Sequence, residues 1–255
     1  MPKVVLKNRT IWITGASSGI GRSLAEVLAA DSNQLIITGR NEQALAEVKS
    51  IAPENIHVVA ADIAHDHSIP TIRQGISKVS ESIDTVILNA GTCEYMEVNN
   101  FSAEMMNRVF QVNTIGMARC IEACLPFVRA SKNAPHIVGV SSAAALTGLP
   151  RAEAYGASKA AIVSFLESLG LDLAASGIDV SVVYPGFVDT PLTRKNDFPM
   201  PFLLTPQQAV KYMIAGIESR RHKIMFPRRL IWSLKLMSML PEELRHRAGL
   251  SMVRG

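Results

Sequence analysis

Short apolar runs alternate along this chain with longer segments of helical period, and this alternation limits the possible folds more than any other feature. The runs are apolar at consecutive positions, which is typical of strands covered on both faces. We expect strands at Thr10–Thr14, Leu35–Thr38, Ile56–Ala60, Thr85–Leu88, His136–Val140, Ile178–Tyr184 and Lys223–Phe226. The intervening segments predict helices at about 19–30, 41–50, 68–80, 103–131, 155–175 and 206–219.

This order predicts an α/β fold, because parallel strands need crossover connections and helices usually supply them. We therefore expect a doubly wound, Rossmann-type parallel sheet of about seven strands with helices on both faces. The chain has 255 residues, enough to bury a large core, and no repeat or flexible linker divides it. Residues 1–226 would form the body of a single domain, and residues 227–255 a basic, apolar, helical extension of it.

In such a sheet, ligands bind beyond the carboxyl ends of the strands, where the strand order reverses. The first predicted strand runs into Thr14-Gly-Ala-Ser-Ser-Gly-Ile-Gly21, which opens a helix. A glycine cluster alone can be a flexible turn or a phosphate cradle. In this context Gly15 would allow a tight turn, Gly19 a close approach to a pyrophosphate, and Gly21 close packing of helix on strand. The loop residues Ser17, Ser18 and Ile20 are further binding candidates.

The second predicted strand ends at Arg40, where a dinucleotide's adenosine ribose would lie. A guanidinium can hold a 2′-phosphate through a bidentate fork but offers no acceptor to a free ribose diol. Arg40, with Arg22 nearby in the first helix, therefore favours NADP(H) over NAD(H); the alternative is that Arg40 only solvates a loop. After the third strand, the Asp62 carboxylate is placed to bond an adenine amino group, with Ile63 beside it.

Tyr155 and Lys159 lie four residues apart at the start of a predicted helix, so both project from one face. A phenol titrates near 10, and a neighbouring positive charge would lower its pKa toward the range of a general acid and base. Such a pair is usually inert when it stands alone. Here Ser141 and Ser142 end the fifth strand thirteen to fourteen residues upstream, and they compete for a place in the same crevice.

Further polar and small residues follow the other strands. Asn89-Ala90-Gly91 ends the fourth strand, Asn113 lies in the long helix after it, and Pro185-Gly186 begins a loop through Val188 to Thr190 after the sixth. Asn89 is expected to tie neighbouring strands together. Each position also has a structural interpretation: Ser142 as a helix cap, and Asn113 as a partner for buried backbone.

In these motifs the chain resembles the short-chain dehydrogenase/reductase family, whose TGxxxGxG, NAG, Ser, YxxxK and PG motifs appear in order over about residues 8–226. The resemblance implies a catalytic tetrad of Asn113, Ser142, Tyr155 and Lys159. It also implies cofactor binding by Gly15, Ser17, Ser18, Gly19, Ile20, Gly21, Arg40, Asp62, Ile63, Asn89, Ala90, Gly91, Tyr155, Lys159, Pro185, Gly186, Val188 and Thr190.

The roles that the resemblance implies fit hydride transfer. Ser142 would donate to the substrate carbonyl oxygen, and Tyr155 would supply the proton in reduction or remove it in oxidation. Lys159 would lower the pKa of Tyr155 and hold the nicotinamide ribose. Asn113 would anchor a water that connects Lys159 with solvent.

The segment at 190–205 corresponds to the family's mobile substrate lid, and its apolar residues favour an apolar ketone or secondary alcohol. Beyond Phe226 the chain is both basic and apolar. From Arg220 onward it has nine Lys or Arg against two Glu, whereas residues 1–219 have seventeen against twenty acidic residues. The apolar run at Leu230–Leu240 would pack within the protein or a dimer, or rest on an anionic membrane surface.

The remaining features exclude several classes of protein. No secretory signal or membrane-spanning stretch is visible, and Cys93, Cys120 and Cys124 are expected to be reduced thiols, so we expect a cytoplasmic protein. Cys93 lies near the predicted nicotinamide position but has no base beside it in the sequence. We expect no metal site at His65, Asp66 and His67 and no binding of nucleic acid. The resemblance implies a homodimer or homotetramer.

The sequence thus predicts an NADP(H)-dependent oxidoreductase that transfers a hydride between nicotinamide and a carbonyl or secondary alcohol. An NAD-linked alcohol dehydrogenase is the alternative among enzymes. A catalytically silent NADP-binding sensor is the alternative from another class, since the fold alone permits it.

Overall fold

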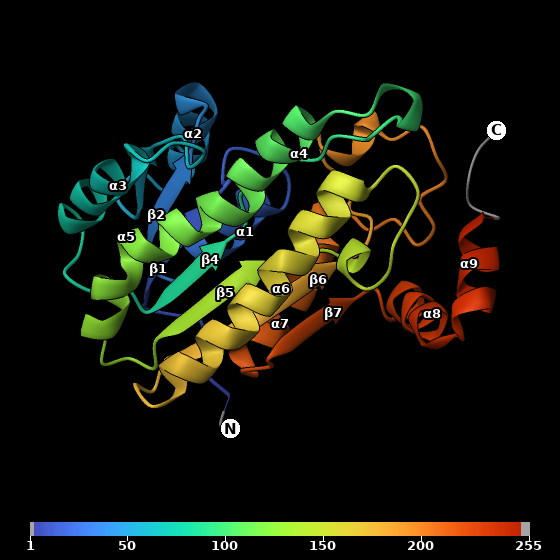
Figure 1. The fold of residues 1–255 in the computed structure, drawn as a ribbon. Coiled ribbons are helices and arrows are strands. Elements are labelled where there is room, and N and C mark those ends of the chain that lie inside the picture. Colours follow the sequence, from blue (N-terminus) through green and yellow to red (C-terminus); the bar gives the residue numbers. More distant parts are fainter. Residues whose placement is uncertain (1–2, 251–255) are drawn as a thin grey trace.

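Seven parallel strands form one sheet in the computed structural model, which describes residues 3–250 (Figure 1). The strand order is β3-β2-β1-β4-β5-β6-β7. The strands are β1 (Thr10–Thr14), β2 (Gln34–Gly39), β3 (Ile56–Ala60), β4 (Thr85–Leu88), β5 (His136–Val140), β6 (Asp179–Pro185) and β7 (Lys223–Phe226). The predicted doubly wound, Rossmann-type sheet is confirmed.

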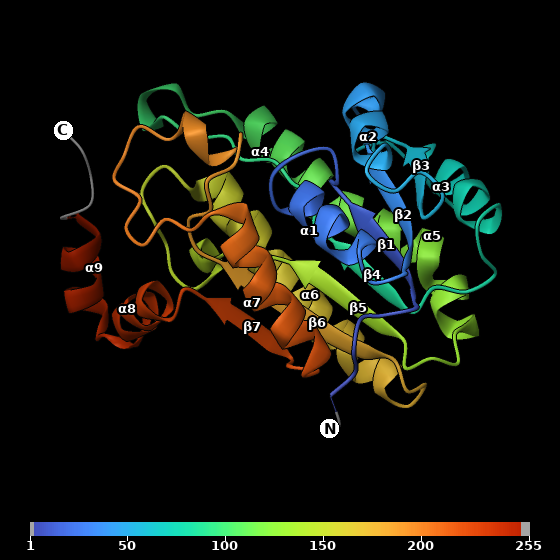
Figure 2. The ribbon, with the colours of Figure 1, turned by 180° about the vertical axis from the view of Figure 1, so that it is seen from behind.

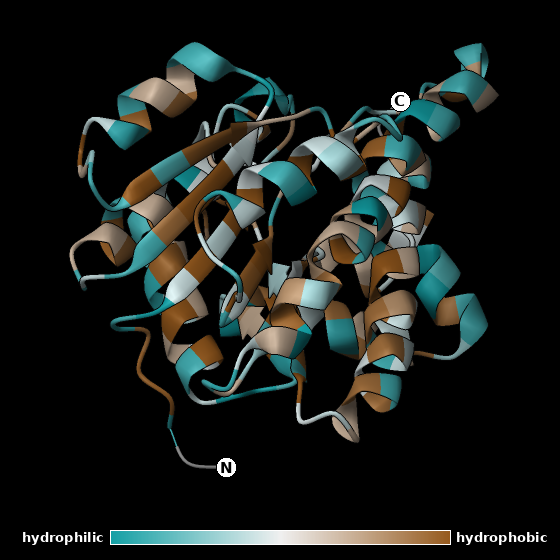
Figure 3. Ribbon diagram, turned by 90° about the vertical axis from the view of Figure 1, so that its left-hand side faces the viewer, coloured by the Kyte–Doolittle hydropathy of each residue, from teal (hydrophilic) through white to brown (hydrophobic). Residues whose placement is uncertain are grey.

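The strands form because their β-branched residues fit a sheet buried on both sides. In β1, Trp12 points to one face and its neighbours Ile11 and Ile13 point to the other, and all three are fully buried. Figure 3 shows the hydrophobic colour along the strands, with helices on either side. The sheet therefore separates two apolar layers, one on each face.

Helices cover both faces of the sheet, as Figures 1 and 2 show from opposite sides. On one face, buried residues of α3 (Ser68–Ser77), α5 (Gly116–Ala130) and α6 (Glu153–Ala174) pack in the same layer as Trp12. On the other, residues of α1 (Gly19–Ala29), α2 (Glu42–Lys49) and α7 (Pro206–Glu218) pack with Ile11 and Ile13. Local capping sets where some helices begin. For example, Thr205 and Gln208 form a capping box at the start of α7.

The single long helix predicted at 103–131 is wrong in one respect. The chain there forms α4 (Ala103–Phe110), a π-helical turn (Gln111–Ile115) and α5 in sequence. The apolar periodicity runs through all three segments, so it does not reveal the extra residue that a π-turn inserts. Asn113 lies at the centre of this turn.

After β7 the chain forms two helices, α8 (Arg228–Met239) and α9 (Glu242–Leu250). Leu230 and Ile231 in the first turn of α8 are buried, and Leu230 packs against the backbone of Gly186 at the end of β6. In both views α8 and α9 lie at the carboxyl ends of the strands, beside the lid segment (Figures 1 and 2). None of the helices described within residues 3–250 has the length and apolarity needed to cross a membrane.

Candidate active site

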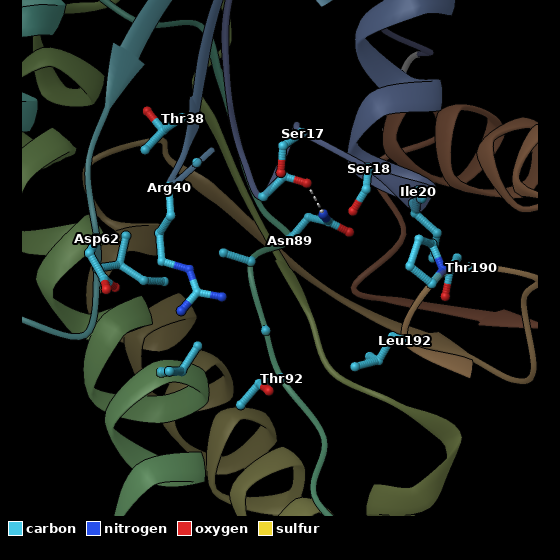
Figure 4. A pocket seen from close by; sticks show the side chains of 18 of the residues that line it. Ser17, Ser18, Ile20, Thr38, Arg40, Asp62, Asn89, Thr92, Thr190 and Leu192 are labelled. Atoms are coloured by element: carbon cyan, nitrogen blue, oxygen red, sulfur yellow. Dashed lines mark hydrogen bonds between the residues drawn. The ribbon is translucent and has the colours of Figure 1, made fainter. Parts of the chain in front are cut away.

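The strand order reverses between β1 and β4, because β1 pairs with β2 on one side and β4 on the other. Two adjoining pockets open beyond the carboxyl ends of these strands and share five lining residues, so they form one crevice. The shared residues are Ile20, Asn89, Gly91, Thr190 and Leu192. Figure 4 shows Arg40 and Asp62 on one side of the larger pocket and Ile20, Thr190 and Leu192 on the other.

The glycine loop between β1 and α1 forms one wall of this crevice. Gly15 adopts φ +68°, in the left-handed region that favours glycine. A Cβ on Gly21 would lie 2.7 Å from the amide nitrogen of Asn89 and closer still to the Gly15 carbonyl oxygen. The Asn89 amide donates to the main-chain oxygens of Thr14 and Gly15, at 3.2 and 3.3 Å. The loop is therefore held against β4 with its backbone close to the crevice.

The first turn of α1 leaves main-chain donors available at this wall. Ser18 is the N-cap of α1, yet its side chain accepts no hydrogen bond from the helix. Ser17, Ser18 and Gly19 all line the larger pocket. An anionic group in the crevice would meet free N–H groups at the positive end of the helix dipole.

Arg40 lines the far end of the crevice and is exposed. Its guanidinium makes no hydrogen bond or ion pair with any residue in the described range 3–250. Arg22, which the sequence analysis placed nearby in the first helix, does not line the pocket; Glu26 at 2.9 Å and Glu47 at 3.3 Å hold its guanidinium instead. Arg40 is thus the arginine that the structure brings to the pocket.

Asp62 and Ile63 also line the pocket, next to Arg40. One carboxylate oxygen of Asp62 accepts a hydrogen bond from the amide of Ala64 at 3.0 Å, which fixes its orientation. The Ile63 side chain is buried and contacts the backbone of Gly116. His65 and His67 stack on one another nearby, but no three His, Cys, Asp or Glu side chains within residues 3–250 gather as a metal site requires.

Ser142, Tyr155 and Lys159 meet at the inner end of the crevice, where all three line the smaller pocket. Ser142 follows β5, and the other two lie one turn apart on α6. The amine of Lys159 donates to the main-chain oxygen of Val140 at 3.0 Å. Pro185, Gly186 and Val188 line the same pocket from the end of β6.

The pKa values at this end are set by burial. Burial raises the pKa of Tyr155 to about 12, and a hydrogen bond with Ser142 opposes it only in part. The expected lowering of this pKa below its ordinary value is therefore not found in the protein without ligand, because burial outweighs the groups that favour the phenolate. Burial also lowers the pKa of Lys159 to about 8. At neutral pH the phenol is a proton donor, and the amine carries its charge.

Asn113 lies behind the pocket and does not line it. Its side chain is fully buried, accepting from the amide of Thr92 at 2.8 Å and donating to the Thr92 oxygen and the Ser158 hydroxyl, each at 2.9 Å. Ser158 lies on α6 next to Lys159. Asn113 thus links the loop after β4 to the helix that carries Tyr155 and Lys159.

The two candidate serines differ in their surroundings. The Ser141 hydroxyl is buried and donates to the main-chain oxygen of Lys159 at 2.7 Å, so it supports α6. The Ser142 hydroxyl is half-buried and accepts from the amide of Ala144 at 3.1 Å. Accepting that bond leaves the Ser142 proton for the Tyr155 oxygen or for a ligand in the pocket.

Two residues near the site, Tyr95 and Arg151, had no role assigned from the sequence. Tyr95 donates to the Asn196 side chain in the lid at 2.6 Å. Arg151 pairs with Glu97 at 2.6 Å and with Asp197 at 3.0 Å, and its guanidinium lies 5.4 Å from the centre of the Tyr95 ring. These contacts join the lid to two other loops. No local pattern in the sequence indicates them, because they join segments that are far apart along the chain.

Cys93 is half-buried beside Tyr95, and Lys159 is close enough to affect its titration. Burial raises the pKa of the Cys93 thiol, and the hydrogen bond with Tyr95 and the charge of Lys159 oppose this only partly. A protonated thiol is a poor nucleophile. All three cysteines are free, and Cys120 and Cys124 are buried.

Comparisons with known proteins agree with this geometry. Residues 9–199 match the family described as short chain dehydrogenase. A protein named "uncharacterized oxidoreductase" from Myxococcus xanthus is 36% identical over 240 residues, covering 92% of this chain and 94% of the relative. Another of that description, from Staphylococcus epidermidis, is 31% identical over 193 residues, covering 76% of this chain and 84% of the relative.

Solved structures share the fold. A short chain dehydrogenase/reductase from Burkholderia phymatum in complex with NAD has a TM-score of 0.81 at 23% identity, covering 91% of this chain and 93% of that one. The Pseudomonas aeruginosa RhlG/NADP active-site complex has a TM-score of 0.82 at 23% identity, covering 91% and 99%. The extent of the family match, together with the identity to the bacterial relatives, shows that this chain is an oxidoreductase of the short-chain dehydrogenase/reductase family.

Proposed function

We propose that this protein is an NADP(H)-dependent oxidoreductase that transfers a hydride between nicotinamide and the carbon of a carbonyl or secondary alcohol. The observation that carries the proposal is the meeting of Ser142, Tyr155 and Lys159 in one pocket. That pocket continues into a crevice with a free arginine at its other end. A binding protein without chemistry would need the glycine loop but not this set.

The crevice fits a dinucleotide along its length. Gly15, Ser17, Ser18, Gly19 and Ile20 line its middle, where main-chain donors of α1 would hold the pyrophosphate. A side chain at Gly21 would break the packing that brings this backbone close. Asn89, Ala90 and Gly91 form the opposite wall, and Pro185, Gly186, Val188 and Thr190 close the inner end. A nicotinamide dinucleotide held here would supply or accept the hydride.

The protein's own groups would handle the proton and the oxygen. In reduction, Tyr155 would donate its proton to the carbonyl oxygen, and its raised pKa keeps it protonated at neutral pH. Ser142 would donate a hydrogen bond to the same oxygen and stabilise the developing negative charge. Lys159, charged below its pKa of about 8, would favour transfer of the proton from Tyr155 and would hold the ribose.

We assign Asn113 a positioning role. Its amide is committed to Thr92 and Ser158, so it fixes the start of α6 relative to the loop after β4. A Cβ on Gly91 would lie 3.1 Å from the Asn113 oxygen and 3.2 Å from the Lys159 amine. The close packing of these three residues explains how an asparagine outside the pocket would keep Lys159 in place.

The free Arg40 guanidinium supports NADP(H) over NAD(H), because a 2′-phosphate can satisfy it through charge-assisted hydrogen bonds. The solved neighbours include a complex with NAD and one with NADP, so they favour neither cofactor. An NAD-linked dehydrogenase is the second candidate. This candidate is favoured if the Asp62 carboxylate, which lines the pocket with Arg40, accepts from the ribose hydroxyls rather than from the adenine amino group.

The lid supports an apolar substrate. Phe198 contacts Tyr95 and Phe187 edge-on, with ring centres 5.6 and 6.0 Å apart. Leu192 lines both pockets. Leu192 in the lining and the aromatic contacts of the lid favour a ketone or secondary alcohol with an apolar body.

A screen of aliphatic, steroid and aromatic ketones tests the proposal, with NADPH and NADH absorbance followed in parallel. We expect turnover of at least one apolar ketone, with a higher kcat/KM for NADPH. Tight NADPH binding without turnover of any ketone or alcohol would instead indicate the silent sensor. Equal affinity for NADPH and NADH would contradict the proposal that Arg40 binds the 2′-phosphate.

A further inference from the structure

Large exposed apolar side chains gather at one end of the molecule. Within residues 3–250 these side chains come from the loop after β4, the lid and the last two helices. They are Val98, Phe101, Phe202, Leu203, Trp232, Leu236, Met239, Leu244 and Leu250. These segments surround the carboxyl ends of the strands, at the same end as the crevice (Figures 1 and 2). An exposed apolar area of this kind marks an interaction surface.

Helix α8 carries the most pronounced part of this surface. Trp232, Leu236 and Met239 are 69%, 68% and 80% exposed. Their spacing of four and three residues places them along one face. Leu230 and Ile231 face the core instead, so the exposed stripe is not the side by which α8 packs on the domain.

Basic residues flank this stripe. Arg228 and Arg229 precede Trp232 by four and three residues, and Lys235 follows it by three, so all lie beside the stripe. The Lys235 amine lies 5.8 Å from the centre of the Trp232 ring. The Arg228 and Arg229 side chains, both exposed, form no hydrogen bond or ion pair within the described part of the chain, and α8 contains no acidic residue.

We propose that this exposed face of α8, defined by Arg228, Arg229, Trp232, Lys235, Leu236 and Met239, docks on an anionic phospholipid surface. A tryptophan and aliphatic stripe with flanking arginines suits the boundary between head groups and acyl chains. Two copies of this face would bring like charges together, which opposes self-association. A nucleic acid would match the charges but not the apolar stripe.

Docking in this orientation brings the lid, with its exposed Phe202 and Leu203, to the lipid surface as well. The crevice would then open toward the bilayer, and an apolar substrate could enter without crossing water. This last consequence rests on the proposed function. The docking itself does not, and vesicle binding can be measured without any turnover.

The chain offers a built-in reporter. Trp12 is fully buried in β1 and Trp232 is 69% exposed, so a change in tryptophan fluorescence on docking comes from Trp232. The full-length protein is titrated with vesicles of phosphatidylcholine alone or of an equal mixture with phosphatidylglycerol. We expect a blue shift and co-sedimentation with the anionic vesicles, with affinity at least about tenfold above that for neutral ones.

Two variants separate the contributions. Arg228→Glu with Arg229→Glu should weaken binding to anionic vesicles about tenfold or more. Leu236→Ser with Met239→Ser keeps the reporter and should abolish the blue shift. Leu171→Ser, at an exposed leucine on α6 away from this face, is the control and should bind as the unchanged protein does.

No blue shift and no co-sedimentation with anionic vesicles would overturn the proposal, as would equal binding by the Leu236→Ser, Met239→Ser variant. A blue shift that grows with protein concentration in the absence of vesicles would also overturn it, in favour of a second copy of the chain. None of these results depends on whether the proposed reductase activity is found.

Discussion

The amine of Lys159 lies 5.8 Å from the centre of the Tyr155 ring, one turn further along α6. Both side chains face one pocket, and burial moves their pKa values apart, raising that of Tyr155 to about 12 and lowering that of Lys159 to about 8. At neutral pH the pair holds one proton on the phenol and one positive charge on the amine. This is the arrangement that carbonyl reduction requires.

The rate of reduction should fall as pH rises through about 8. Because burial lowers the pKa of Lys159, its charge is present below that pH and lost above it. The dependence of kcat/KM on pH checks this. Lys159→Arg, whose guanidinium stays protonated, should keep some activity and lose this inflection. If the Lys159→Arg variant keeps the inflection near pH 8, a group other than Lys159 causes it.

Arg40→Ala should weaken NADPH binding about ten- to a hundredfold while changing NADH affinity little, because it removes a charge-assisted contact that only the 2′-phosphate makes. Isothermal titration with each cofactor measures this. Arg22→Ala is the control, since its guanidinium is held by Glu26 and Glu47 outside the pocket. Equal losses for both cofactors would exclude a phosphate-specific role for Arg40.

Gly21→Ala should destabilise the protein by about 1–3 kcal/mol and weaken cofactor binding, because the added Cβ would meet the Gly15 carbonyl and the Asn89 amide. Thermal unfolding with and without NADPH measures both effects. Gly148→Ala serves as the control, since its Cβ would meet nothing within 4 Å. Equal unfolding temperatures for the two variants would show that the packing around Gly21 accommodates a methyl group without cost.

His136 should make the fold sensitive to acid. Its side chain is fully buried, with Nε2 2.7 Å from the Ser181 hydroxyl. Burial, helped by the charges of Arg220, Arg9 and His222, lowers its pKa to about 3. Between about pH 6.5 and 3, His136 is therefore protonated in the unfolded chain but neutral in the folded protein.

Stability should accordingly fall as pH drops below about 6.5, with about 2 kcal/mol lost at pH 5 through this group. Urea unfolding at pH 7 and pH 5 measures the loss. His136→Gln keeps a partner for Ser181 but does not titrate, so its stability should change less between the two pH values. An identical change in both proteins would show that His136 is not the sensitive group.

Local patterns in the sequence predicted the sheet well. Runs such as Thr10–Thr14 and His136–Val140 are buried on both faces, so each carries consecutive apolar residues that mark the strand. The positions of Gly15 and Ser142 followed from their places after strand ends, and those of Tyr155 and Lys159 from their spacing at the start of a predicted helix. Parallel strands bring those ends to one edge whatever the details of packing.

Features that depend on contacts between distant segments were not predictable in this way. The apolar period runs through residues 103–131 and gives no sign of the π-turn at Gln111–Ile115. Asn113 lies in this turn, and its hydrogen bonds to Thr92 and Ser158 join segments that are distant in the sequence. The bond between Tyr95 and Asn196 joins residues 101 positions apart. The direction of the Tyr155 pKa shift was not predictable either, because it depends on how deeply the phenol is buried, which residue spacing does not give.

The central claim is that the Tyr155 phenol transfers the proton that accompanies hydride transfer. Its most direct test is Tyr155→Phe, assayed for kcat/KM with a ketone that the unchanged protein reduces and for NADPH affinity by titration. The account predicts a loss of activity of about 10²–10⁴-fold or more with NADPH binding largely retained. A variant that binds NADPH and reduces the ketone at an undiminished rate would contradict it.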